Sequence, residues 1–206
     1  MRETDWPARR RLRNRLSGRT VYCQLARQKM TTRWEIMPGL PPTGPLAISF
    51  KPGGGAVHSE GFVVRFLPAT RDPWTGNFLP SFGQLTGIFA HPDDRRAVVV
   101  AGGQGYVVDI ESACVTEEFG ADLGEVFDVA EPRALVFAGY TSLDVITPTE
   151  TWRSARVSWD GIANLRVRGT SVVGDGFDPL NDSWQAFDVD LSTHELTGGA
   201  YPKELP

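Results

Sequence analysis

His58-Ser59-Glu60 places an imidazole, a hydroxyl and a carboxylate at consecutive positions, directly after the glycine-rich segment 52–57. Successive side chains of an extended chain point to opposite faces, so His58 and Glu60 could share one side while Ser59 points away. This geometry argues against a local serine–histidine pair, and in a metal-dependent enzyme it would let both side chains ligate a divalent ion. No Lys-Ser/Thr pair and no helical segment follow the glycines, which excludes a P-loop. We predict a binding loop at His58 and Glu60; the alternative is a loop with a purely structural histidine.

A second candidate lies in the polar segment 71–77, in which Trp74 is followed by Thr-Gly-Asn. A partly exposed tryptophan beside polar loop groups offers a large contact area at a small entropic cost. We predict Trp74 and Asn77 as recognition residues, against the alternative that this loop is anchored in its own core. The other two histidines are expected to be structural. His91 would cap or pack the bend of a His-Pro-Asp turn, and His194 would lie on the solvated surface.

The chain lacks the signatures of common catalytic and metal sites. It contains no HExxH, GxSxG, EF-hand loop or dinucleotide fingerprint, and its carboxylates are scattered. Cys23 and Cys114 are 91 positions apart, with no CxxC pair and no histidine cluster, so neither a disulfide framework nor a zinc site is indicated. We expect no metal and no cofactor. A metal-dependent enzyme would need His58, Glu60 and other acidic loop residues to converge within about 5 Å.

Charge divides the chain into a basic arm and an acidic body. Residues 1–33 contain ten basic and two acidic residues, a net charge of +8, whereas residues 34–206 contain 11 basic and 23 acidic residues, a net charge of −12. We expect residues 1–33 to be a disordered or partly helical extension and residues 34–206 to form a single domain. Nucleic acid could bind only through this arm. The arm is also what an open reading frame started too early would contain, which makes Met30 a candidate start.

The body has the pattern of short strands. Between Gly61 and Ala200, apolar runs of four to seven residues alternate with Gly, Pro, Asp and Asn, and no stretch keeps helical spacing for a dozen residues. The connections are too short for crossover helices, so we predict an all-β fold of chiefly antiparallel sheet, with Trp159 and Trp184 helping to fill the core. The predicted strands are 62–66, 85–90, 97–101, 106–110, 114–119, 125–130, 134–138, 143–146, 152–158, 162–168, 171–177, 184–190 and 195–198.

Three segments carry turn residues with a clear conformational reason. Gly102, Gly103 and Gly105 lie between two Val-rich runs, where a tight hairpin needs positive φ, and Asp160-Gly161 favours a second hairpin. Segment 178–182 contains Asp, Pro and Asn and predicts a longer polar loop.

A weak internal repeat relates parts of the body. Val99 and Val136 occupy similar turn-then-strand segments 37 residues apart, and Val172 follows 36 residues later. A period near 40 with about four short strands in each unit indicates propeller blades or a related stack of antiparallel β-meanders. About three units fit between residues 87 and 199. Either segment 46–82 forms a divergent fourth unit or the array stays open, with its edges covered or paired in a homodimer.

The body also resembles known proteins. Segment 91–100, together with YVVD at 106–109, resembles the repeat of bacterial propellers of the lactonase and TolB type. Segments spread over residues 34–201 resemble a family of small bacterial proteins with no assigned function, so this resemblance implies no activity. They are WEIMPGLPP at 34–42, HSEG at 58–61, WTGNF at 74–78, GGQGY at 102–106 and SWDG at 158–161.

These features favour a non-catalytic β-repeat module that binds a protein or a small molecule. Two alternatives stay open: a metal-dependent hydrolase of the propeller-lactonase kind, and an immunity- or antitoxin-like inhibitor whose acidic body meets a basic toxin. No apolar run approaches the ~20 residues that cross a bilayer, and the first thirty residues lack a secretory apolar stretch. We therefore expect no membrane partner and a cytoplasmic location.

Overall fold

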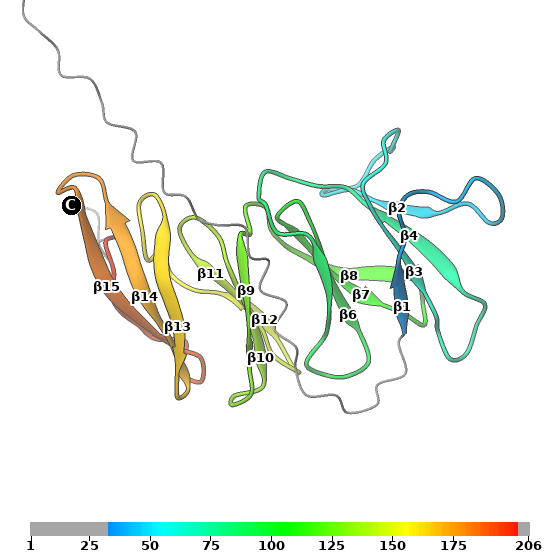
Figure 1. Ribbon diagram of the computed structural model, residues 1–206. Coiled ribbons are helices and arrows are strands. Elements are labelled where there is room, and N and C mark those ends of the chain that lie inside the picture. The colour runs from blue at the N-terminus through cyan, green and yellow to red at the C-terminus, as the bar shows by residue number, and fades with distance from the viewer. Residues whose placement is uncertain (1–32, 202–206) are drawn as a thin grey trace, which may run out of the picture. The chain divides into compact units, whose positions relative to one another are not determined.

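The protein is described by a computed structural model that covers residues 33–201 (Figure 1). The predictions for the basic extension lie, apart from Arg33, outside these residues. All regular structure in residues 33–201 is β-strand, which confirms the prediction of an all-β fold. None of it is a helix that could cross a bilayer.

The first sheet is the irregular one. Its strands, in their order across the sheet, are β1 (Trp34–Ile36), β3 (Phe62–Phe66), β4 (Trp74–Phe78) and β2 (Ile48–Phe50). β2 runs parallel to β4, whereas β3 is antiparallel to both β1 and β4. This sheet is the divergent fourth unit that the sequence left open, and it also includes residues 34–36.

The other three sheets are meanders whose strands pair antiparallel in chain order. The second sheet contains β5 (Gly87–Ala90), β6 (Ala97–Ala101), β7 (Gln104–Asp109) and β8 (Cys114–Gly120). The third contains β9 (Glu125–Val129), β10 (Ala134–Ala138), β11 (Leu143–Ile146) and β12 (Thr151–Arg153). The fourth contains β13 (Ile162–Arg168), β14 (Ser171–Asp178), β15 (Ser183–Asp190) and β16 (Leu196–Gly198).

Consecutive sheets pack face to face through three apolar clusters, which join sheet 1 to sheet 2, sheet 2 to sheet 3 and sheet 3 to sheet 4. β6 shows how: Val99 belongs to the cluster with sheet 1 and Val98 to the cluster with sheet 3. Because both faces of β6 and β10 are covered, every residue of these strands is buried, and their sequences are continuous apolar runs. No apolar cluster of the described residues joins sheet 1 to sheet 4, so residues 33–201 form an open row of sheets (Figure 1).

The internal repeat matches the sheets. Val99, Val136 and Val172 lie in β6, β10 and β14, the second strands of three successive sheets. Equivalent strands therefore recur at the predicted interval, and the prediction of blade-like repeats is confirmed.

The predicted turns have mixed outcomes. Gly102 and Gly103 form the two-residue turn between β6 and β7 with φ of 47° and 80°, as predicted. The prediction that Gly105 belongs to this turn is wrong, because Gly105 lies within β7 and pairs with Val100. Segment 178–182 connects β14 and β15, also as predicted. The hairpin at Asp160-Gly161 is wrong, because these residues link β12 to β13 and thus join two different sheets. For the same reason the strand predicted at 152–158 ends at Arg153.

The prediction that Trp184 fills the core is wrong. Its side chain is 51% exposed, because β15 belongs to the last described sheet and Trp184 pairs with Phe177 on the face turned away from sheet 3. The rings of Trp184 and Phe177 lie 5.1 Å apart. Trp159 is half-buried in the link from β12 to β13, where its ring lies 4.6 Å from that of Tyr201.

Glu111 ties the turn between β7 and β8 to sheet 1. Its carboxylate accepts hydrogen bonds from the N–H of Ala69 (3.0 Å) and of Thr70 (3.1 Å) and from the Thr70 hydroxyl (2.7 Å), and it pairs with Arg33. The Ala69 N–H, followed by the Thr70 hydroxyl, lowers the pKa of Glu111 from 4.5 to about 2. The stabilisation that this carboxylate supplies is therefore complete above pH 4.5 and is lost as the pH falls toward about 2.

A carboxyl ¹³C titration tests this contact. We expect a Glu111 midpoint near pH 2 in the wild-type protein. In Thr70→Val the midpoint should rise, because one donor to the carboxylate is gone. A wild-type midpoint at the ordinary value for glutamate would contradict the network.

Candidate functional site

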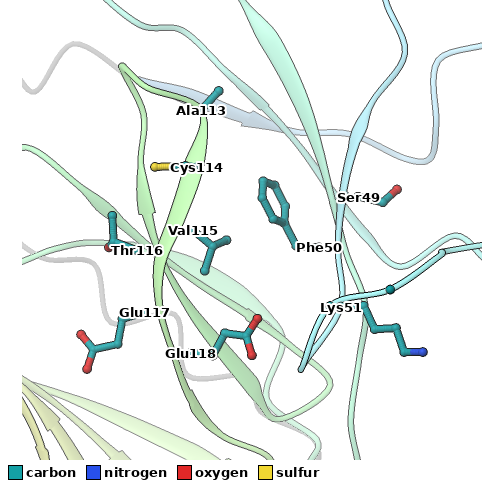
Figure 2. Close-up of a pocket in the computed structure, with 11 residues that line it drawn as sticks. Ser49, Phe50, Lys51, Ala113, Cys114, Val115, Thr116, Glu117 and Glu118 are labelled. Atoms are coloured by element: carbon teal, nitrogen blue, oxygen red, sulfur yellow. The ribbon is translucent and has the colours of Figure 1, made fainter.

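A groove separates β2 of the first sheet from β8 of the second (Figure 2). Each of these strands is the last one in the order of its sheet, so each has one free edge within the described sheets. The groove has a volume of about 610 Å³ and is lined by residues 49–51, 54–55 and 113–118. The two sides are about sixty residues apart in the chain, so the packing of sheet 1 on sheet 2 creates the groove.

The centre of the groove is apolar. Figure 2 shows Phe50 of β2 and Val115 of β8 pointing into the space between the strands, whereas Cys114 and Thr116 point away from it. Phe50 and Val115 are both half-buried and pack against the apolar cluster between the two sheets. Their remaining exposed surface is available to a ligand.

Glu118 supplies the negative charge of the groove. Its carboxylate turns toward the groove, whereas that of Glu117 points to the other side of β8 (Figure 2). Val115 and Glu118 are three positions apart, a spacing that strict alternation would place on opposite faces. A bulge at Thr116, where the register with β7 shifts, brings both side chains to the same face.

The glycine-rich loop reaches from the end of β2 to β8. The Gly53 N–H donates a hydrogen bond to Glu118 Oε2 (3.2 Å). Gly53, Gly54 and Gly55 have φ of 70°, 76° and 99°, which only glycine adopts without strain. Gly54 and Gly55 therefore line the groove beside Glu118.

The groove combines apolar side chains, a carboxylate and a free strand edge. Its lining includes no histidine, so neither the Cys114 thiol nor the Thr116 hydroxyl has an imidazole base beside it in the groove. The exposed Cys114 thiol lies 3.0 Å from the Ser112 hydroxyl, which supplies no base either. Its useful groups are an apolar centre, one carboxylate and the free edge of β8.

Asn77, predicted as a recognition residue, is buried with 1% of its surface exposed. Its Oδ1 accepts a hydrogen bond from the Gly61 N–H (2.7 Å), and its Nδ2 donates to Ser49 Oγ (3.1 Å) and to the Ser59 carbonyl (3.1 Å). These bonds hold the 51–61 loop on sheet 1. Asn77 therefore positions the loop beside the groove and presents no free polar atom to a ligand.

The expectation that Trp74 is partly exposed is wrong. Trp74 starts β4, is only 7% exposed, and stacks on Phe66 with ring centroids 4.3 Å apart. Its Nε1–H donates to the Ile110 carbonyl (2.9 Å), which satisfies the one polar atom of the ring. The side chain lies on the face of sheet 1 that meets sheet 2, so the alternative of a tryptophan anchored in the core describes it.

His58 and Glu60 are exposed in the 51–61 loop but do not line the groove. Glu60 Oε2 accepts a hydrogen bond from the Leu40 N–H (2.9 Å), which ties this loop to segment 37–40. No hydrogen bond or ion pair of the described residues involves the His58 side chain. Thus the structure brings neither residue to a shared site.

The other histidines have structural contacts. His91 is 1% exposed, and its Nδ1 accepts the Asp93 N–H (3.1 Å), which confirms its role in the bend. Burial lowers the pKa of His91, which favours the neutral ring that this bond requires. His194 is exposed, as predicted, and its ring also stacks on that of Trp152 with centroids 4.1 Å apart.

Within residues 33–201, no group of three or more His, Cys, Asp or Glu side chains is placed to hold a metal ion. The convergence around His58 and Glu60 that the hydrolase alternative needs is not found there. No family model, curated protein or solved structure matches the chain. The resemblances described above therefore stay predictions.

The groove itself was missed from the sequence. β2 is a three-residue strand with the sequence ISF, too short to show an alternating pattern, and its neighbour β4 is joined to it in parallel. The predicted strand 114–119 contained Val115 and Glu118, but the bulge that aligns their side chains cannot be predicted from residue types.

Proposed function

We propose that this protein is a non-catalytic binding module whose groove between β2 and β8 holds a polypeptide segment of a partner. The observation that carries this proposal is the apolar pair Phe50 and Val115 beside the free edge of β8. A concave apolar site with a few polar groups is the usual form of a recognition site. The groove contains no histidine, and no metal-ligand set is found among the described residues, so the proposal rests on the apolar pair, the Glu118 carboxylate and the free edge of β8.

A peptide-display experiment tests the proposal. The full-length protein is panned against a library of random dodecapeptides, and the selected peptides are synthesised and titrated against wild-type protein and variants. Phe50→Ala should weaken their binding at least about fivefold, because truncation of an aromatic anchor costs more than about 1 kcal/mol. Phe82→Ala is the matched control, because Phe82 is 82% exposed and does not line the groove.

Val115→Ser provides a second groove variant if Phe50→Ala disturbs sheet 1, and near-UV circular dichroism verifies that each variant is folded. Selected peptides whose affinities are the same for wild type, Phe50→Ala and Val115→Ser would overturn the proposal, as would a library that yields no binder.

A further inference from the structure

The free edge of β8 is longer than the edges of the fourth strands in the other two meander sheets. The equivalent fourth strands β12 and β16 contain three residues each, whereas β8 contains seven. Short edges are one way in which proteins prevent unwanted pairing, so a long edge at one position offers a template for an added strand. In residues 33–201, β8 has a strand partner on one side only, β7.

The main-chain groups at this edge can be assigned from the turn between β6 and β7. A two-residue turn makes the flanking residues, Ala101 and Gln104, a hydrogen-bonded pair, and bonding then alternates along β7. Glu118 lies opposite Tyr106, whose main-chain N–H and C=O form hydrogen bonds with β6 in this alternation, so Tyr106 and Glu118 do not bond to each other. The N–H and C=O of Glu118 therefore point to the free edge, and the same argument applies to Val115, which pairs with Val108.

Val115 and Glu118 thus offer their main chain to the free edge and their side chains to the groove. A strand added along β8 would direct every second side chain into the groove. A side chain opposite Val115 would contact the apolar centre, and one opposite Glu118 would face a carboxylate. Only Oε2 of Glu118 has a partner among the described residues, namely Gly53, and the Lys51 side chain points away from β8 (Figure 2).

The negative charge at β8 favours a basic partner over a second copy of this chain. Pairing β8 with β8 of a second copy would bring Glu117 and Glu118 near the same residues of the other chain, and like charges opposite one another destabilise a sheet. The body as a whole is acidic, with a net charge of −12 over residues 34–206. A basic partner is favoured on both counts.

We propose, resting on the binding function above, that the partner segment is an extended basic peptide that adds to β8 as a strand. A Lys or Arg of this peptide lies opposite Glu118 and an apolar residue lies opposite Val115. Recognition of this kind combines main-chain bonds, which give affinity, with alternate side chains, which give specificity.

Three nine-residue peptides test this inference on the full-length protein. In each peptide Thr occupies every second position, and the positions in between hold Val except for one variable residue. The variable residue is Lys, Gln or Glu. The Lys peptide should bind roughly threefold to tenfold more tightly than the Gln peptide, and the Glu peptide most weakly. Glu118→Gln should abolish this preference, whereas Glu117→Gln, which removes the same charge from the opposite face of β8, should leave it intact.

Methylation of single peptide amides tests the strand geometry. Methyl groups at alternate positions should weaken binding and those in between should not, because only every second N–H of an edge strand bonds to β8. Equal effects of Glu117→Gln and Glu118→Gln, no alternation, or a charge preference absent in the wild type would overturn this inference. If one of these results is found but peptide binding is still weakened by Phe50→Ala, the proposed binding function remains supported. Binding that is independent of Phe50 and Val115 would instead remove the function itself.

Discussion

Phe137→Ala should lower the free energy of unfolding by about 3–5 kcal/mol. Phe137 lies in β10, has no exposed surface, and belongs to the cluster that joins sheet 2 to sheet 3. Its ring centroid lies 5.2 Å from that of Phe119 and 5.8 Å from that of Phe89, both in sheet 2. Truncation removes the favourable transfer free energy of the ring and leaves a cavity between sheets 2 and 3. The cost of this cavity is large because packed sheets move together only partly to fill it.

Urea denaturation followed by circular dichroism measures this loss, with Phe82→Ala as the control. Phe82 is 82% exposed in the link from sheet 1 to sheet 2, so its removal should change the stability by no more than about 0.5 kcal/mol. A similar effect of the two substitutions would mean that the interface between sheets 2 and 3 is not packed as described.

The three meander sheets were predictable because local signals mark two of them and the internal repeat extends to the third. β6 and β10 are continuous apolar runs bounded by turn residues, and the pair Gly102-Gly103 fixes a tight reversal between β6 and β7. The repetition of these signals at intervals of 36 and 37 residues adds a consistency that no single strand provides.

The first sheet was not predictable in the same way. β1 and β2 contain three residues each, and β4 contains Thr, Gly and Asn, which are typical of loops. Their strand conformation depends on tertiary contacts: β1 and β4 pair with β3, β2 pairs with β4, and Trp74 stacks on Phe66. Such contacts cannot be predicted from the residue types of the strand itself.

The candidate site shows the same limit at the level of side chains. Asn77 and Trp74 were chosen because their types suit recognition, yet both satisfy their polar atoms within the protein. Residue type indicates what a side chain can do, whereas burial decides whether a ligand can reach it. Phe50 and Val115 are ordinary apolar residues and become a candidate site only because two sheet edges meet.

Gly103→Ala should destabilise the protein by at least about 3 kcal/mol, the sum of backbone strain and overpacking. Gly103 has φ of 80°, a conformation in which an alanine is strained. An added Cβ would also lie 2.4 Å from Gly83 Cα and 2.6 Å from Gly83 N. The clash is with backbone in the link between sheets 1 and 2, which cannot move aside as a flexible side chain would.

Gly54→Ala separates the two causes. Gly54 has nearly the same φ, 76°, but no atom lies within 4 Å of the position of its Cβ. We therefore expect a loss of about 1–2 kcal/mol, from strain alone. Urea unfolding of both variants yields the difference, which measures how closely the turn between β6 and β7 approaches the link that precedes sheet 2. Equal losses would show that this approach is looser than described, and would leave the sheet 1–sheet 2 junction, and with it the walls of the groove, without the rigidity that a preformed binding site needs.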